Sequence, residues 1–252
     1  HFEPGFSRVR DIERATGISV LSAVPKIRFS RQQSFDNKAF DEQRSRFAGS
    51  IDMLLGRIMM RKSGGRGIML TVTSCLPGEG KTTVTLALAH LAARIGYKCL
   101  VIDGDFCRSR ITRSLGLQAS SGLADVLDHS RKLDEVTTQL SDTALYVLPA
   151  GHSTHGIGRL LGSDSFRSMI HGLTHEYDLI IIDSSPLMAT AEPQILAQIA
   201  DQTLMVVRWK KTPRATIQDA IERLSKATGV ICDIALSQVN SGRGKLKYYG
   251  DA

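Results

Sequence analysis

A lysine and two threonines follow a glycine-rich turn in the stretch TVTSCLPGEGKTT, which spans residues 71–83. The backbone N–H groups of such a turn can wrap a polyphosphate, and a helix that begins near Lys81 points its positive dipole end at the same anion. Lys81 adds a mobile charge for the β and γ oxygens, and the Thr82 hydroxyl can ligate Mg²⁺. The stretch therefore predicts a phosphate-binding loop, with phosphate contacts from Pro77, Gly78, Glu79, Gly80, Lys81, Thr82 and Thr83.

Three aspartates stand at or just beyond the ends of two apolar runs: Asp103, Asp105 and Asp183. Magnesium prefers oxygen ligands and keeps several waters, so one or two carboxylates, the Thr82 hydroxyl and the phosphates would complete its shell. Asp183 fits the aspartate that holds Mg²⁺ at the end of a second strand. Either Asp103 or Asp105 could contact the metal or accept a proton from an attacking hydroxyl, and the sequence does not separate these two roles.

Apolar, partly β-branched runs alternate with helical patterns along most of the chain. This alternation predicts an α/β fold with a mostly parallel sheet and helices on both faces, in which ligands bind at the carboxyl ends of the strands. The loop has Cys75 where the usual first glycine of the phosphate-loop motif stands, so it is of a deviant type. The predicted strands are 68–72, 99–102, 144–148, 179–183, 203–207 and 230–236. One predicted helix begins near residue 81, and three others cover 123–127, 164–176 and the region 217–224.

The chain has 252 residues, 42% of them hydrophobic, which is enough for one α/β domain with an N-terminal extension. We expect a linker segment over residues 1–37 and the nucleotide-binding domain over 38–252. That domain begins with a helical extension over 38–62 and ends in a tail over 241–252. An apolar stripe marks the extension as an amphipathic helix that packs either on the domain's own sheet or on a neighbouring subunit: Phe40, Phe47, Ile51, Leu54 and Ile58.

The composition of the chain bears on three further properties: nucleic-acid binding, membrane segments and the state of the cysteines. The formal net charge is +7, but only 6% of the residues are aromatic and no basic stripe alternates with stacking rings, so we expect no nucleic-acid partner. No apolar run reaches the eighteen residues of a membrane helix, so any membrane segment of a parent protein would lie upstream. Cysteines without metal-type spacing are best explained as free thiols in a reducing cytoplasm: Cys75, Cys99, Cys107 and Cys232.

Three motifs together resemble the bacterial tyrosine kinases, the cytoplasmic domains of polysaccharide co-polymerases: SCLPGEGKTT, LVIDGDFCRSR and LIIIDSSP. The resemblance implies an ATP- and Mg²⁺-dependent kinase at the cytoplasmic face of the inner membrane, with a transmembrane co-polymerase region upstream. It implies phosphorylation of a C-terminal tyrosine cluster by a neighbouring subunit in a ring-shaped homo-oligomer that governs export of capsule or exopolysaccharide. Here the phosphoacceptors would be Tyr248 and Tyr249. Lys81 and Asp103 or Asp105 would be catalytic, and the metal ligands would be Thr82, Asp183 and Asp103.

The chain departs from the family's pattern at several of its motifs. Cys107 stands where an arginine is expected, and Ser237 stands where an asparagine near the adenine is expected. Asp41, Arg44 and Phe47 occupy the spacing of the E-x-x-R-x-x-R in the helix that docks the next subunit, and the tail has only two tyrosines. These differences leave a second hypothesis open, an ATP-dependent assembly switch of a co-polymerase with little or no kinase activity. A soluble positioning ATPase is disfavoured, because the extra lysine early in its loop is absent.

Overall fold

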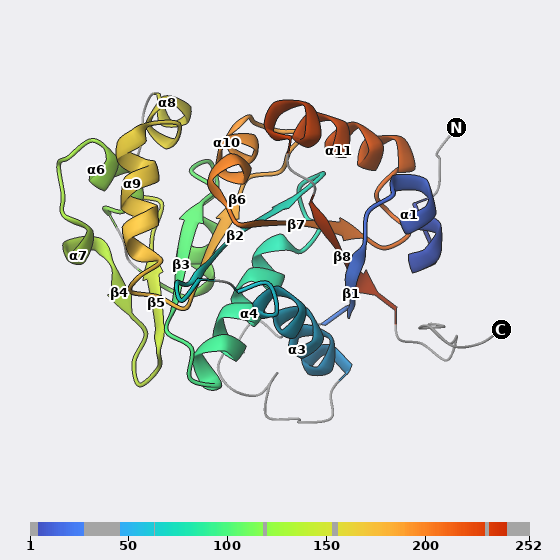
Figure 1. Cartoon of the computed structure of the whole chain (residues 1–252), viewed down its shortest axis with the longest axis horizontal. Coiled ribbons are helices and arrows are strands. Elements are labelled where there is room, and N and C mark those ends of the chain that lie inside the picture. Colours follow the sequence, from blue (N-terminus) through green and yellow to red (C-terminus); the bar gives the residue numbers. More distant parts are fainter. Residues whose placement is uncertain are drawn as a thin grey trace.

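The described residues form one eight-stranded sheet with helices on both of its faces (Figure 1). The computed structural model describes residues 5–27, 46–62, 64–117, 120–152, 156–229 and 232–240. The strand order is β1-β8-β7-β2-β6-β3-β5-β4, and every neighbouring pair is parallel except the short β4–β5 pair at one edge. The prediction of a mostly parallel, doubly covered α/β sheet is therefore confirmed.

The elements follow one another mostly as strand, helix and strand. The strands are β1 (Val20–Pro25), β2 (Ile68–Ser74), β3 (Cys99–Gly104), β4 (Thr138–Gln139), β5 (Leu145–Leu148), β6 (Leu179–Ser184), β7 (Gln202–Arg208) and β8 (Asp233–Val239). The helices are α1 (Val9–Thr16), α3 (Arg46–Met59), α4 (Lys81–Arg94), α5 (Arg110–Ser114), α6 (Leu123–Leu127), α7 (Leu133–Val136), α8 (Ile157–Leu161), α9 (Asp164–Leu173), α10 (Glu192–Ile199) and α11 (Arg214–Thr228).

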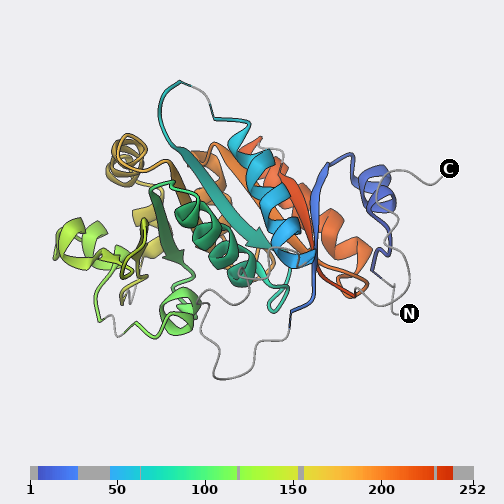
Figure 2. The ribbon, with the colours of Figure 1, turned by 90° about the horizontal axis from the view of Figure 1, so that it is seen from below.

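Alternate residues of each central strand enter cores on opposite faces of the sheet, as the period of two in a strand requires. In β2, Leu70 and Val72 pack with α3 and α4, whereas Met69 faces the other side. Figure 2 shows α3 and α4 lying across one face of the sheet. The opposite face is covered by α1 and α11 near β7 and β8, and by α6, α8, α9 and α10 near β3 and β6. Because both faces are buried, the strands read as continuous apolar runs.

The described part of the N-terminal segment, residues 5–27, belongs to this folded unit, whereas we predicted a linker segment over residues 1–37. Strand β1 extends the sheet by pairing in parallel with β8, and α1 packs against the same edge through the fully buried Ile12. The Arg57 side chain of α3 donates to the Val20 and Leu21 carbonyl oxygens of β1 at 3.3 and 2.6 Å. Apolar burial on both sides of β1 therefore holds residues 5–27 in place.

The other predicted boundaries agree in part. The helix predicted over 38–62 is observed as α3 from Arg46, and residues 28–45 lie outside the described part of the chain. Helix α9 ends at Leu173, short of the predicted residue 176, and β8 begins at Asp233, three residues later than predicted. Within the described ranges, no helix combines the length and apolar character needed to cross a membrane.

Candidate active site

The predicted phosphate loop joins the carboxyl end of β2 to the first residue of α4. Gly78 and Gly80 have positive φ angles of 82° and 95°, a backbone conformation that side chains rarely allow. This conformation turns the chain sharply enough for Lys81 to begin the helix, and the Lys81 side chain is then almost wholly buried. Cys75, which replaces the motif's usual first glycine, is fully buried, and its Sγ lies 3.6 Å from the Met205 Sδ. The first glycine's place is therefore part of the apolar core.

Lys81 lies between two of the three predicted aspartates. Its ammonium is 3.2 Å from Asp105 Oδ2 and 3.4 Å from Asp183 Oδ2, and all three side chains are buried. The strand register explains this meeting, because Asp103 is the neighbour of Asp183 on the paired strands β3 and β6, and Asp105 follows two residues later. Removing one member of such a buried network would leave an uncompensated charge. The arrangement thus places the Lys81 ammonium at the end of the glycine turn, between two carboxylates.

Two threonines of α4 contact the Asp183 carboxylate. Thr82 Oγ1 donates to Asp183 Oδ2 at 2.7 Å, and Thr85 Oγ1 donates to Asp183 Oδ1 at 3.2 Å. Burial raises the pKa of Asp183, while the nearby Lys81 charge and the Thr82 hydrogen bond oppose that rise. Thr85 was not among the residues singled out in the sequence. It lies three residues after Thr82, so helical spacing placed it on the same face of α4 and could have identified it.

Asp103 is occupied by other backbone and side-chain donors. Its Oδ2 accepts from the Thr112 backbone N–H at 3.3 Å and the Thr112 hydroxyl at 3.2 Å, and its Oδ1 accepts from the Asp105 N–H at 3.3 Å. Burial, followed by the charge of Asp183, raises the pKa of Asp103 to about 6. These contacts connect the end of β3 to the start of α5. Nothing in the sequence linked Thr112 to Asp103, because the two are nine residues apart across an irregular turn.

Asp105 differs from Asp103 because one of its oxygens has no hydrogen-bond partner in the part of the chain that the structure describes. Asp105 Oδ1 is buried and has no hydrogen bond to any described residue, while Oδ2 faces Lys81. A buried carboxylate oxygen without a partner is costly, so it marks a place where a cation, a water or a substrate hydroxyl fits. The donor set of a lysine, hydroxyls and aspartate oxygens matches the chemistry of phosphates and Mg²⁺.

The outer side of the glycine turn is held by residues from the ends of β7 and β8. The Glu79 carboxylate is buried and accepts from the Leu76 N–H at 2.8 Å and from the Thr212 hydroxyl. Burial raises the pKa of this carboxyl. The Ser237 hydroxyl donates to the Glu79 carbonyl oxygen, and Gln238 Nε2 donates to the Gly78 carbonyl oxygen at 2.9 Å. These partners lie over 130 residues beyond the loop, so no local pattern could reveal them.

The structure brings some of the predicted site residues together, places others elsewhere and leaves others outside the described ranges. The structure brings together Lys81, Thr82, Asp105 and Asp183, and places Asp103 one contact away through the Asp105 N–H. Cys107, two residues after Asp105, is exposed, whereas Phe47 of α3 is buried in the core. Predicted phosphoacceptors Tyr248 and Tyr249, and the helix residues Asp41 and Arg44, lie outside the described residues.

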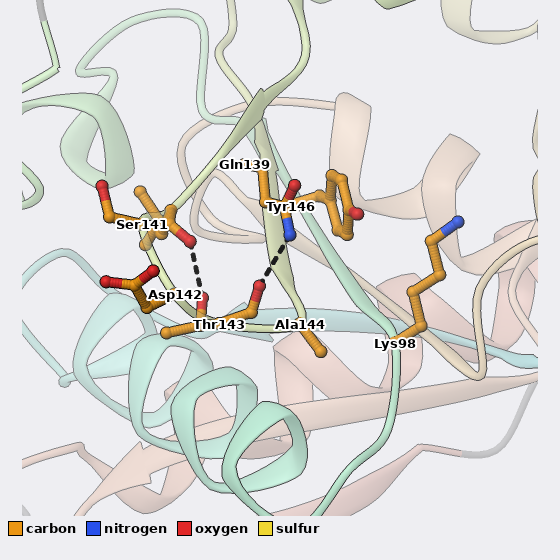
Figure 3. A pocket seen from close by; sticks show the side chains of 8 residues that line it. Lys98, Gln139, Ser141, Asp142, Thr143, Ala144 and Tyr146 are labelled. Carbon is orange, nitrogen blue, oxygen red and sulfur yellow. Dashed lines mark hydrogen bonds between the residues drawn. The ribbon is translucent and has the colours of Figure 1, made fainter.

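A hollow lies at the β5–β4 edge of the sheet (Figure 3). Its volume is about 680 Å³, and it is lined by Lys98 and Tyr146 and by the turn over residues 139–144. Lys98 comes directly before β3, whereas Asp105 follows that strand, so the hollow is separated from the aspartates by the strand's length. The Lys98 ammonium lies 4.6 Å from the ring centre of Tyr177 and 5.3 Å from that of Tyr146. This hollow is therefore distinct from the phosphate loop.

Known proteins resemble this chain in sequence. A family model described as an AAA domain matches residues 69–231. The tyrosine-protein kinase YwqD of Bacillus subtilis is 31% identical over 183 residues, which cover 71% of this chain and 76% of YwqD. AmsA of Erwinia amylovora is 30% identical over 155 residues, which cover 62% of this chain but 21% of AmsA. The chain thus spans most of some relatives and about a fifth of others.

Solved structures share the fold. The kinase domain of the Escherichia coli tyrosine kinase ETK superposes with a TM-score of 0.82 at 21% identity, covering 97% of this chain and 98% of that one. That likeness shows the fold, and the sequence matches above show the relationship. The buried lysine at the start of α4, facing two strand-end aspartates, is the arrangement that this fold uses to bind nucleotides. The chain therefore belongs to the bacterial tyrosine-protein kinases, enzymes of the P-loop type.

Proposed function

We propose that this chain is a Mg²⁺- and ATP-dependent kinase that phosphorylates Tyr248 and Tyr249 in the C-terminal tail of a neighbouring copy. The observation that carries this proposal is the contact of Lys81 with both Asp105 and Asp183, next to the Thr82 hydroxyl. Phosphoryl transfer requires mainly positioning and charge stabilisation, and this set provides a cation, metal-type oxygens and a carboxylate within one buried cluster.

Each residue has a distinct role in this proposal. The turn over residues 77–83 binds the phosphates through its N–H groups, and Lys81 leaves its aspartate partners to neutralise charge on the transferred group. Thr82 and Asp183 would hold Mg²⁺, which would neutralise negative charge on the ATP phosphates. Among the described residues, no three His, Cys, Asp or Glu side chains form a metal-binding group. A magnesium ion that relies on one or two carboxylates, a hydroxyl and substrate phosphates fits this site.

Asp105 is the carboxylate that we assign to the incoming phenol. Its Oδ1 is the partnerless oxygen of the cluster, whereas both oxygens of Asp103 already accept hydrogen bonds. In the proposed step the phenol oxygen attacks the γ-phosphorus, the bond to the ADP oxygen breaks, and the phenol proton passes to Asp105. Asp103 then supports the site by holding the turn to α5 and remains the second candidate for a metal contact.

The wider setting follows from the resemblance set out above. We place the chain at the cytoplasmic face of an inner membrane, attached to or paired with a transmembrane co-polymerase region, as a ring-like homo-oligomer that regulates exopolysaccharide or capsule export. The likeness to tyrosine-protein kinases such as YwqD supports the kinase activity in this proposal. The burial of Phe47 means that this position of α3 is not available to a neighbouring subunit, so any ring would use other residues of the helix.

Mixing two complementary variants tests transfer between copies. One variant, Lys81→Met, keeps the tail tyrosines, and the other, with Tyr248→Phe and Tyr249→Phe, keeps the active site. Each alone should incorporate no phosphate from MgATP, and the mixture should label the tail of the Lys81→Met chain only. A mixture that stays unlabelled, while the wild-type chain labels itself, would contradict transfer between copies.

A further inference from the structure

Two carbonyl groups of the glycine turn are held from outside by neighbouring residues of β8. Gln238 Nε2 donates to the Gly78 carbonyl oxygen at 2.9 Å, and the Ser237 hydroxyl donates to the Glu79 carbonyl oxygen. Ser237 is buried, and its hydroxyl also lies 3.3 Å from the Val207 carbonyl oxygen of β7. The end of the sheet thus fixes two consecutive peptide units of the loop.

Because the peptide unit is planar, a hydrogen bond that fixes its carbonyl group also fixes the direction of its N–H group. In a trans peptide the C=O and the following N–H point in opposite directions. Holding the Gly78 and Glu79 carbonyls toward β8 therefore directs the N–H groups of Glu79 and Gly80 away from β8. Neither N–H has a protein acceptor among the residues that the structure describes. Backbone donors without partners inside a folded loop indicate a place where an acceptor binds.

The backbone of Gln238 is held in a conformation that costs energy. Its φ angle is +54°, in the left-handed region that non-glycine residues seldom occupy. Such conformations persist where the surrounding structure enforces them, and they cluster at functional sites. Here this conformation accompanies the hydrogen bond from the side chain to the Gly78 carbonyl oxygen, although β8 is otherwise regular through Val239.

The Glu79 side chain fixes the same peptide units from a second direction. Its carboxylate accepts from both the Leu76 N–H and the Thr212 hydroxyl, and Thr212, four residues beyond β7, is itself buried. Glu79 is therefore held through its side chain as well as through its carbonyl oxygen. Rotation of the Glu79–Gly80 peptide would break the Ser237 hydrogen bond.

We propose that Ser237 and Gln238 are positioning residues for the nucleotide, which aim the Glu79 and Gly80 N–H groups at its phosphates by holding the two carbonyls behind them. This inference rests on the proposed function, because it assigns those N–H groups to the ATP phosphates. It gives Ser237 a role in phosphate binding, whereas the resemblance placed an asparagine near the adenine at this position.

The test compares Ser237→Ala and Gln238→Ala with the wild-type chain and with Ser22→Ala. Ser22 is a matched control, because it is a buried serine of the neighbouring strand β1 whose hydroxyl donates to the Ser50 carbonyl oxygen at 2.8 Å, away from the loop. The Kd for MgADP is measured by calorimetry, and KM for MgATP and kcat are measured by phosphate incorporation. Thermal unfolding of each variant is recorded alongside.

We expect each loop variant to raise the Kd and the KM by roughly five- to tenfold, with kcat within about twofold of wild type. Ser22→Ala should lower thermal stability by a similar amount to Ser237→Ala but leave Kd within about twofold. The inference is overturned if both loop variants bind MgADP as tightly as wild type, or if Ser22→Ala weakens binding equally. A wild-type chain that binds no MgADP would instead contradict the proposed function itself, and this inference with it.

Discussion

Thr82 Oγ1 donates a 2.7 Å hydrogen bond to Asp183 Oδ2, the same oxygen that lies 3.4 Å from the Lys81 ammonium. Two of the three predicted magnesium ligands are therefore in direct contact within the folded chain. Their meeting depends on the pairing of β2 with β6, which aligns Val72 with Asp183 and brings the start of α4 over the end of β6.

Asp183→Asn should reduce kinase activity by about 10²- to 10³-fold, because it removes the carboxylate that we assign to Mg²⁺. The change also removes a buried charge that faces Lys81. Binding of ADP should persist without Mg²⁺, but added Mg²⁺ should no longer tighten it. Calorimetric titration with ADP in the presence and absence of Mg²⁺ measures this difference. An unchanged gain from Mg²⁺ in the variant would show that Asp183 is not the ligand.

Asp105→Asn and Asp103→Asn should have different effects, because we assign a catalytic role to Asp105 and a structural role at the turn to α5 to Asp103. Asp105 has the partnerless oxygen, so its replacement should lower kcat by about 10²-fold or more and leave the Kd for MgADP within a few-fold. Asp103 accepts three hydrogen bonds, so its replacement should act mainly on the turn to α5. Single-turnover rates and nucleotide affinities of both variants decide this. A larger loss of kcat in Asp103→Asn than in Asp105→Asn would reverse the assignment.

The raised pKa of Asp103 predicts a pH dependence of stability. Its pKa is about 6 in the folded chain, against about 3.9 for an unperturbed aspartate, so between these values the folded chain binds the proton more tightly than the unfolded chain. The contribution of Asp103 to stability is thus fully present below about pH 4 and is lost as the pH rises through 6. The loss is on the order of 2 to 3 kcal/mol.

Urea unfolding of wild type and Asp103→Asn at several values between pH 4 and pH 7 tests this dependence. The wild-type free energy of unfolding should fall relative to that of the variant as the pH rises through this window. Parallel pH profiles for the two chains would mean that Asp103 does not titrate there.

Cys107→Arg should raise activity without a change in stability. Cys107 is exposed just beyond Asp105, so a longer side chain meets no packing restriction at this position. A charge-assisted hydrogen bond restored at the site is worth about 1.5 to 3 kcal/mol, which corresponds to an increase in kcat/KM of about tenfold or more. Steady-state kinetics measure the gain, and Cys107→Ala provides the control for loss of the thiol. Equal activity in the Arg and Ala variants would show that this position does not contact the reacting groups.

The sequence predicted those parts of the structure that depend on local pattern. The glycine turn, the strand before it and the helix from Lys81 follow from residue types within a dozen positions, and the structure has all three. The carboxyl-end rule for parallel sheets also predicted that Asp105 and Asp183 would meet Lys81, although they lie 24 and 102 residues away from it.

What the sequence did not reveal depends on contacts between distant segments. The sequence predicted a backbone contact between Glu79 and the phosphates, but it did not show that the Glu79 carboxylate turns inward to Thr212, 133 residues away. The N-terminal segment was expected to be a linker, yet hydrogen bonding to β8 and burial against α1 and α3 make it the edge of the sheet. Side-chain direction at a turn and the pairing of an edge strand are both decided by tertiary packing, which no local pattern encodes.

Intact-mass measurement with phosphosite mapping after incubation with MgATP tests most directly whether the site around Lys81 phosphorylates the C-terminal tail. Wild type and Lys81→Met are compared at equal concentration, and circular dichroism confirms that both are folded. We expect one or two added phosphates on Tyr248 and Tyr249 of wild type and none on Lys81→Met. Equal phosphate on both chains would contradict the assignment of the active site. No phosphate on a wild-type chain that binds MgATP would contradict the kinase and favour a nucleotide-dependent assembly switch.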